Sequence, residues 1–111
     1  MKIKTPGRIC LFGEHQDYLG LPVIAMAISK FSSLSGVARN DAKVVIRKPD
    51  INDIEEFSLN DIKYDSKQDI FKSGFNICKR FGFKFSRGFD VTVKSDIPIK
   101  AGTSSSSSLL V

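Results

Sequence analysis

Three polar residues near the N-terminus, Glu14, His15 and Asp17, could do chemistry together. Carboxylates accept hydrogen bonds and an imidazole donates or accepts them, so this group can bind several hydroxyls of one ligand. General acid–base catalysis, metal binding and a purely structural role in capping a turn also stay open. Adjacent residues of a strand point to opposite faces, so Glu14 and His15 can meet one substrate only if the chain turns there.

A second candidate site lies at the other end of the sequence, where Pro98 is followed by Ala101-Gly102 and then by five serines, Ser104 to Ser108. A glycine turn that leads into a helix exposes backbone N–H groups, which attract anions. Serine hydroxyls add donors for phosphate oxygens and can ligate Mg²⁺. The spacing is not that of a Walker loop. The residues alone leave a phosphate site, a serine helix cap and a linker as alternatives.

Arg8 begins the strand that leads to the acidic-histidine group. A surface cation is one interpretation of this residue. The other is a guanidinium that stabilises charge on a transferring phosphoryl group, a role that suits a permanently charged planar donor. The sequence alone does not separate the two.

The elements that must position these residues are mostly strands. Apolar runs predict strands at 2–5 and 8–13, separated by Pro6-Gly7, and the second run is expected to be buried on both faces. Further strands are predicted at 23–28, 31–37, 43–47 and 89–94.

One helix is predicted over residues 68–81, with Gly82 as its stop. Its apolar face is expected to comprise Ile70, Phe71, Phe75, Ile77, Cys78 and Phe81. The preceding segment, 50–69, holds seven of the twelve acidic residues. It is predicted to be a solvated loop or a weak edge strand, held down by Phe57, Leu59 and Ile62.

Composition limits the class of protein. The 111 residues suffice for one domain, and they contain neither a membrane-spanning apolar run nor a signal peptide, so a cytoplasmic location is expected. Cys10 and Cys78 are predicted to be reduced thiols in the core. The net charge of +5 suits an anionic partner. The aromatic and basic residues do not form an RNA-stacking pattern, which disfavours nucleic acid.

The last three residues, Leu109-Leu110-Val111, resemble the beginning of an apolar helical face without a stop signal. The sequence therefore predicts that these residues are the N-terminal part of a longer protein.

Two segments together resemble the GHMP superfamily of small-molecule kinases, and galactokinases in particular. Residues 6–28 read PGRICLFGEHQDYLGLPVIAMAI, which is similar to the galactokinase signature G-R-V-N-L-I-G-E-H-T-D-Y-N-G-G followed by an apolar strand. Residues 97–111 read IPIKAGTSSSSSLLV, which is similar to the second family motif, P-x-G-A-G-L-S-S-S-A-S.

The resemblance implies an α+β fold, the β-rich N-terminal domain of the GHMP kinase (ribosomal protein S5 domain 2-like) type, incomplete within residues 1–111. It implies a sugar-binding turn at 8–20 and a phosphate loop at 98–108. Arg8 would stabilise the transition state, and the catalytic base would lie beyond Val111, so the 111 residues alone are expected to be inactive. The implied sugar-binding residues are Glu14, His15, Gln16 and Asp17. Those along the nucleotide phosphates are Lys100, Ala101, Gly102, Thr103, Ser104, Ser105 and Ser106, with Ser105 and Ser106 near Mg²⁺.

The implied activity is transfer of the γ-phosphoryl group of ATP to a sugar hydroxyl, expected to be the anomeric one. The implied partners are a small sugar, ATP and Mg²⁺, with no nucleic acid and no membrane; the oligomeric state is not predicted. The sequence departs from the family pattern at Gln16, Leu19 and Leu21 in the sugar-binding turn, which leaves the identity of the sugar open, and at Thr103 in the phosphate loop. A kinase for another small alcohol, such as mevalonate, and a noncatalytic sugar- and ATP-sensing relative are the alternatives. Asp17 favours a sugar, because mevalonate kinases lack this aspartate.

Overall fold

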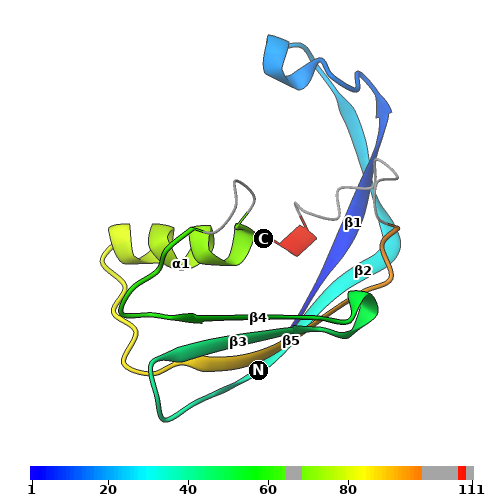
Figure 1. The fold of residues 1–111 in the computed structure, drawn as a ribbon. Helices are drawn as coiled ribbons and strands as arrows, with labels where there is room; N and C mark the ends of the chain where they lie inside the picture. The colour runs from blue at the N-terminus through cyan, green and yellow to red at the C-terminus, as the bar shows by residue number, and fades with distance from the viewer. Residues whose placement is uncertain (65–68, 99–107, 110–111) are drawn as a thin grey trace. The chain divides into compact units, whose positions relative to one another are not determined.

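The computed structural model describes residues 1–64, 69–98 and 108–109, and it is dominated by a five-stranded sheet in the order β1-β2-β5-β3-β4 (Figure 1). The α-helix α1 (Ile70–Arg80) lies between β4 and β5 in the chain, and Ser108 and Leu109 are also helical. The architecture is therefore the predicted α+β type. The strands are β1 (Lys2–Phe12), β2 (Ile24–Ala38), β3 (Lys43–Lys48), β4 (Asp53–Ser58) and β5 (Phe89–Ser95), and the 3-10 helices are η1 (Asp17–Leu19) and η2 (Pro49–Ile51).

The chain divides into two compact units. The first comprises Met1–Ile3 and Leu34–Lys94, and the second comprises Lys4–Ser33 and Ser95–Leu109. The strands β1, β2 and β5 each contribute residues to both units, whereas β3, β4 and α1 belong to the first.

The core of the first unit is centred on β3, as its apolar sequence predicts. This strand pairs antiparallel with β4 and parallel with β5, so that Val45 faces Glu56 on one side and Asp90 on the other. Val44, Val45 and Ile46 are 0%, 3% and 1% exposed. A strand with neighbours on both edges and side chains packed on both faces is expected to be this apolar.

The helix α1 lies over one face of the sheet formed by β3, β4 and β5 (Figure 1). The ring of Phe75 joins helix and sheet, because its centroid lies 5.6 Å from that of Phe57 on β4 and 6.0 Å from that of Phe89 on β5. Phe85 adds a third ring at 5.1 Å. Such edge-to-face and tilted pairs add to the apolar area that each ring buries.

The predicted helix is confirmed, but two members of its predicted apolar face are wrong. Gly82, at φ +86°, follows the helix as the predicted stop, and Gln68 lies outside the described residues. Ile77 and Phe81 are exposed, because they lie at the end of the helix. Lys72 is instead only 3% exposed, with its ammonium 5.9 Å from the Phe57 ring centroid and 3.7 Å from the Asp69 carboxylate.

The predicted break at Pro6-Gly7 is wrong, since β1 runs through both residues. β1 is the first strand of the sheet order, and proline is tolerated on an edge strand because no neighbour needs its missing N–H group. The same position explains why burial of residues 8–13 on both faces is also wrong, because Leu11 and Phe12 are exposed. The strands predicted at 23–28 and 31–37 are one continuous strand, β2.

The acidic segment is confirmed as an edge strand in part, since β4 is the last strand of the sheet. Phe57 and Leu59 are buried and Ile62 is half-buried, so they hold the segment down as predicted. Both cysteines are free, but Cys10 and Cys78 are half-buried, so their assignment to the core is wrong.

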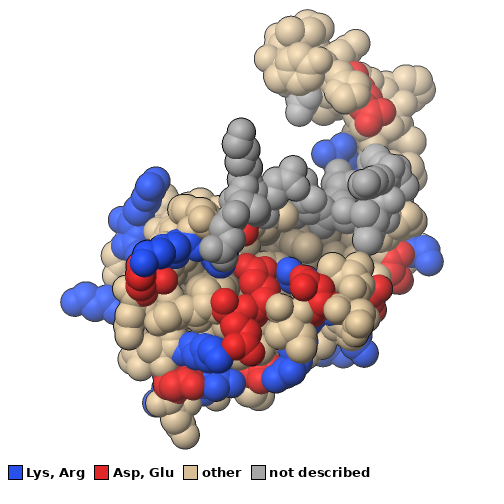
Figure 2. Space-filling model, viewed as in Figure 1, with Lys and Arg blue, Asp and Glu red and all other residues tan. Residues whose placement is uncertain are grey.

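The surface of the first unit carries acidic and basic side chains side by side (Figure 2). Arg39 donates two hydrogen bonds to the carboxylate of Asp41, at 2.8 and 2.7 Å, and Arg47 donates two to Asp90, both at 3.2 Å. The paired guanidinium of Arg39 lowers the pKa of Asp41 from 3.8 to about 2. Arg47 lowers the pKa of Asp90, and Lys43 lowers that of Glu56 from 4.5.

These ion pairs predict a loss of stability in acid. The folded pKa values of the three carboxyls lie below their ordinary values, so the unfolded chain binds more protons and acid favours unfolding. We expect the free energy of unfolding to fall as the pH is lowered from about 4.5 to about 2. Urea unfolding midpoints at low ionic strength across this interval measure the effect.

The matched variants are Arg39→Ala, which removes a pairing guanidinium, and Arg80→Ala, which removes one from the exposed end of α1. Arg39→Ala is expected to flatten the pH dependence and Arg80→Ala to leave it unchanged. Equal slopes in all three proteins would contradict the assignment.

Candidate functional site

The acidic-histidine group forms the turn between β1 and β2. Gln16 N donates to Gly13 O at 3.0 Å, which makes Glu14 and His15 the two central residues of a four-residue turn. His15 has a φ of +64°, the left-handed conformation that a type II turn requires at this position. The turn satisfies the condition set by the sequence, because Glu14, His15 and Gln16 are exposed at one place and need not alternate across a strand.

Backbone hydrogen bonds continue this turn into η1. The carbonyl oxygen of Gln16 accepts from Leu19 N at 3.0 Å and from Leu21 N at 3.2 Å. Asp17 begins η1, and its side chain lies outside the described part of the chain. The sequence-predicted sugar-binding residues therefore follow one another on a turn that is fixed by its own backbone.

Gly13 permits the chain to close at the base of this turn. Its φ is +84°, and a Cβ atom there would lie 2.8 Å from Pro22 O and 3.2 Å from the Cα atom of Val23. A side chain would therefore meet the backbone of the returning strand. The glycine lets the two strands approach each other and sets the position from which Glu14 projects.

Arg8 lies on β1 and is exposed. The two-residue repeat of a strand places it on the same face as Cys10 and Phe12, five positions before Gly13. Apolar side chains are also exposed along this hairpin, so the polar turn is presented within an apolar surface: Leu11, Phe12, Tyr18, Leu19, Leu21, Val23 and Ile24.

The phosphate-binding prediction falls largely outside the described residues. This holds for all of its named members, Lys100, Ala101, Gly102, Thr103, Ser104, Ser105 and Ser106, and thus for the Mg²⁺ ligands. The two ends of the segment are described: Ile97 and Pro98 precede it, and Ser108 follows it as a buried helical residue.

Sequence analysis missed the residues that hold these ends. Ser32 on β2 is 0% exposed and its hydroxyl lies 2.7 Å from that of Ser108 and 3.1 Å from that of Ser95. We call Ser32, Ser95 and Ser108 the serine cluster. A serine within an apolar strand is a weak signal, because the same pattern is common on exposed strands, and no spacing rule connects positions 32, 95 and 108.

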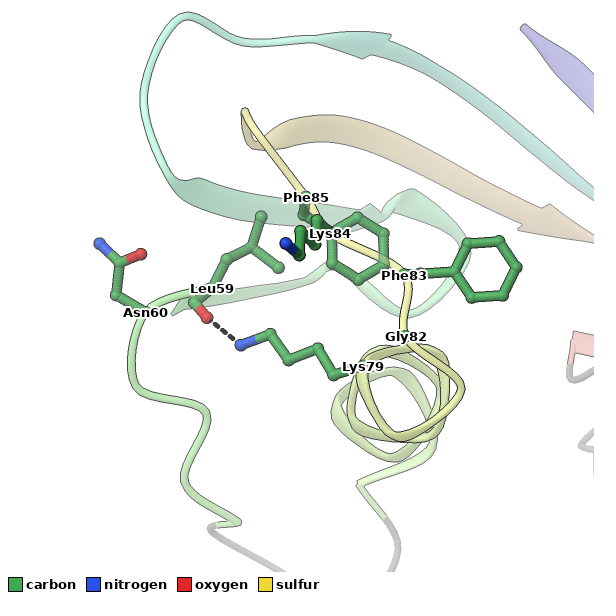
Figure 3. A pocket seen from close by; sticks show the side chains of 7 residues that line it. All are labelled: Leu59, Asn60, Lys79, Gly82, Phe83, Lys84 and Phe85. Carbon is green, nitrogen blue, oxygen red and sulfur yellow. Dashed lines mark hydrogen bonds between the residues drawn. The ribbon is translucent and has the colours of Figure 1, made fainter.

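A cavity of about 480 Å³ lies in the first unit, where α1 ends and the chain turns toward β5 (Figure 3). Lys79 donates a hydrogen bond from its ammonium to the carbonyl oxygen of Leu59, so this cation is engaged with the protein (Figure 3). Within residues 1–64, 69–98 and 108–109, none of the sequence-predicted site residues lines the cavity. Its lining residues are Leu59, Asn60, Lys79, Gly82, Phe83, Lys84 and Phe85.

Among residues 1–64, 69–98 and 108–109, no three histidine, cysteine, aspartate or glutamate side chains are grouped to hold a metal ion. In the described part of the chain, none of the helices has the length and hydropathy needed to cross a bilayer.

Two family descriptions match the two ends of the chain. The galactokinase galactose-binding signature matches residues 2–33, which contain β1, the turn and most of β2. The GHMP kinases N-terminal domain matches residues 69–111, which contain α1, β5 and the serine segment.

Individual proteins agree with these matches. Galactokinase of Ligilactobacillus salivarius is 37% identical over 110 residues, covering 95% of this chain and 28% of that protein. The crystal structure of Lactococcus lactis galactokinase complexed with galactose superposes with a TM-score of 0.85 at 30% identity, covering 98% of this chain and 29% of that one. The crystal structure of Methanococcus jannaschii mevalonate kinase gives a TM-score of 0.81 at 29% identity, covering 99% and 37%. The chain thus spans less than a third of the length of the galactokinases that it matches.

Proposed function

Because this chain belongs to the GHMP kinase superfamily, we propose that it forms the N-terminal part of a galactokinase-like enzyme that uses ATP to phosphorylate a sugar hydroxyl. The observation that carries this proposal is the coincidence of the galactose-binding signature at 2–33 with an exposed turn bearing Glu14, His15 and Gln16. The hydroxyl is expected to be the anomeric one. Residues 1–111 belong to a ribosomal protein S5 domain 2-like N-terminal domain, and the enzyme acts in the cytoplasm.

The turn supplies the acceptor side of the site. Glu14 and Asp17 accept hydrogen bonds from sugar hydroxyls through their carboxylates, and His15 and Gln16 both donate and accept. A turn fixed by its backbone holds these groups before the sugar arrives, so less conformational freedom is lost on binding. This is what acceptor recognition requires, because phosphoryl transfer depends on holding the attacking oxygen in line.

The segment 98–108 supplies the donor side. Lys100 to Ser106 would bind the ATP phosphates, whose negative charge backbone N–H groups, hydroxyls and one ammonium would neutralise. Ser105 and Ser106 would hold Mg²⁺, which when bound would neutralise charge on the transferring phosphoryl group. Support for this assignment comes from the match of the GHMP kinases N-terminal domain to residues 69–111.

Arg8 stabilises negative charge on the phosphoryl group during its transfer, a role that its exposed position on β1 allows. The catalytic base is contributed by a part of the protein outside these 111 residues. Catalysis by this chain therefore consists of positioning and electrostatic stabilisation.

A kinase that phosphorylates mevalonate is the second candidate, favoured by the likeness to Methanococcus jannaschii mevalonate kinase over 99% of this chain. The discriminating experiment measures ADP release by the whole protein with a panel of sugars and with mevalonate. ATP turnover with a sugar supports the proposal, turnover with mevalonate alone replaces it, and binding of sugar and ATP without turnover identifies a noncatalytic sensor.

The acceptor role of the turn predicts a selective defect. Asp17→Ala is expected to raise KM for the sugar by about 30-fold and to leave KM for ATP unchanged, because a charged acceptor of sugar hydroxyls is lost. Initial-rate kinetics with each substrate varied in turn measure the split. Asp61→Ala is the matched control, since it removes an exposed aspartate from the first unit and should change neither constant. An unchanged sugar KM in Asp17→Ala would remove the aspartate from the site.

A further inference from the structure

The serine cluster is a buried polar group, and sequence analysis assigned no role to two of its members, Ser32 and Ser95. Ser32 is 0% exposed and Ser108 is 4% exposed, and their hydroxyl oxygens lie 2.7 Å apart. Ser95 Oγ lies 3.1 Å from Ser32 Oγ and accepts a hydrogen bond from Ile97 N at 3.3 Å. All of these residues belong to the second unit.

The cluster connects both ends of the segment 98–108 to the same place on β2. Ser95 and Ile97 precede the segment, Ser108 is its last residue, and Ser32 contacts the serine on each side. Phe31, the neighbour of Ser32 on β2, also contacts the chain just before this segment. Asp96 N donates to Phe31 O at 3.1 Å, and Phe31 N donates to the Asp96 carboxylate.

The chemistry of hydroxyls makes this arrangement specific. A serine hydroxyl has one hydrogen to donate and two lone pairs, so Ser32 can donate to one neighbour and accept from the other. Removing one hydroxyl in a buried position leaves its partner without that bond, which costs more than the same loss at the surface. Ser32 thus fixes the separation of two residues that are thirteen positions apart in the chain, Ser95 and Ser108.

We propose that Ser32 is a positioning residue for ATP binding, which holds the two ends of the phosphate loop 98–108 through Ser95 and Ser108. The inference rests on the proposed function, because it takes this segment as the phosphate loop. Loop residues bind phosphate well only when the elements at both loop ends hold them in place. The serine cluster supplies that support from β2, the strand that follows the acceptor turn in the chain.

The test compares Ser32→Ala and Ser108→Ala with Ser35→Ala, which removes an exposed serine from the same strand, in the whole protein. Each cluster variant is expected to raise KM for ATP about tenfold and to leave KM for the sugar within about twofold, whereas Ser35→Ala is expected to change neither constant. The double variant is expected to resemble Ser32→Ala, because that substitution alone already removes the bond between Ser32 and Ser108.

A merely structural role would change both substrates alike. Equal increases in KM for ATP and for the sugar, or unchanged constants in folded variants, would overturn the inference. If thermal unfolding shows that Ser32→Ala is not folded, the test uses Ser108→Ala instead, because this substitution removes only one of the bonds of Ser32.

Titration with a non-hydrolysable ATP analogue separates this inference from the proposed function. A wild-type protein that binds the analogue but phosphorylates no sugar contradicts the proposed function, whereas weaker binding by the cluster variants still supports the role of Ser32. A wild-type protein that does not bind the analogue contradicts both. An active wild type with equal analogue affinity in all variants overturns the role of Ser32 alone.

Discussion

Replacing Arg8 with alanine is expected to lower kcat for sugar phosphorylation about 10³-fold, because in the proposed function the guanidinium stabilises charge that exists only in the transition state. An interaction absent from the ground state lowers kcat and kcat/KM equally, so KM for ATP and for the sugar should stay nearly constant. Arg8→Lys is expected to recover only part of the loss, since an ammonium lacks the planar pair of donors. Steady-state kinetics of the whole protein measure both effects.

Lys2→Ala is the matched control for this prediction. Lys2 carries the same charge on the same strand and the same face, six residues farther from the turn. Its removal should leave kcat within about twofold, because screened surface charges act weakly at a distance. A comparable loss in Lys2→Ala would show that net charge on β1 rather than Arg8 supports the reaction. A fall in kcat of less than tenfold in Arg8→Ala would contradict its role in stabilising the transition state.

Gly88→Ala is expected to be the most destabilising single substitution considered for the first unit. A Cβ atom on Gly88 would overlap the carbonyl oxygen of Lys43, and it would lie 2.7 Å from the carbonyl carbon of the same residue. The backbone must move to relieve this, which breaks the hydrogen bond from Arg39 N to Gly88 O, now 2.8 Å long. We expect a loss of about 4 kcal/mol in the free energy of unfolding.

Gly74→Ala is the control, and it is expected to change the free energy of unfolding in the opposite direction. Gly74 lies in the middle of α1, and a Cβ atom there meets nothing within 4 Å. Alanine is the better helix former, so this substitution should stabilise the protein by about 0.5–1 kcal/mol. Urea or thermal unfolding of both variants measures the pair. A Gly88→Ala variant as stable as wild type would show that the approach of Gly88 to Lys43 is not a feature of the fold.

The fold could be predicted where local sequence and tertiary position agree. The run Val44-Val45-Ile46 predicts β3, because a strand paired on both edges needs apolar residues on both faces. It could not be predicted where position in the sheet overrides local preference. Pro6 resembles a strand break, yet the edge position of β1 makes its missing donor harmless.

The candidate site divides in the same way. Glu14 and His15 could be found from residue types alone and Gln16 only from the family resemblance, and their turn follows from Gly13 and from the backbone bond that Gln16 makes. Ser32 could not be found, because its importance comes from contacts with residues more than sixty positions away. The burial of Lys72 could not be predicted either, because its position near Phe57 depends on how α1 packs on the sheet.

The parallel pairing of β3 with β5 has a consequence for synthesis on the ribosome. β3 is complete at Lys48 and pairs with β4 soon afterward, but its other neighbour is provided only by residues 89–92. At about 5–20 residues per second, the edge of β3 that faces β5 stays unpaired for a few seconds after β3 has been synthesised. The rate of translation therefore sets how long this edge is available to chaperones or to other nascent chains.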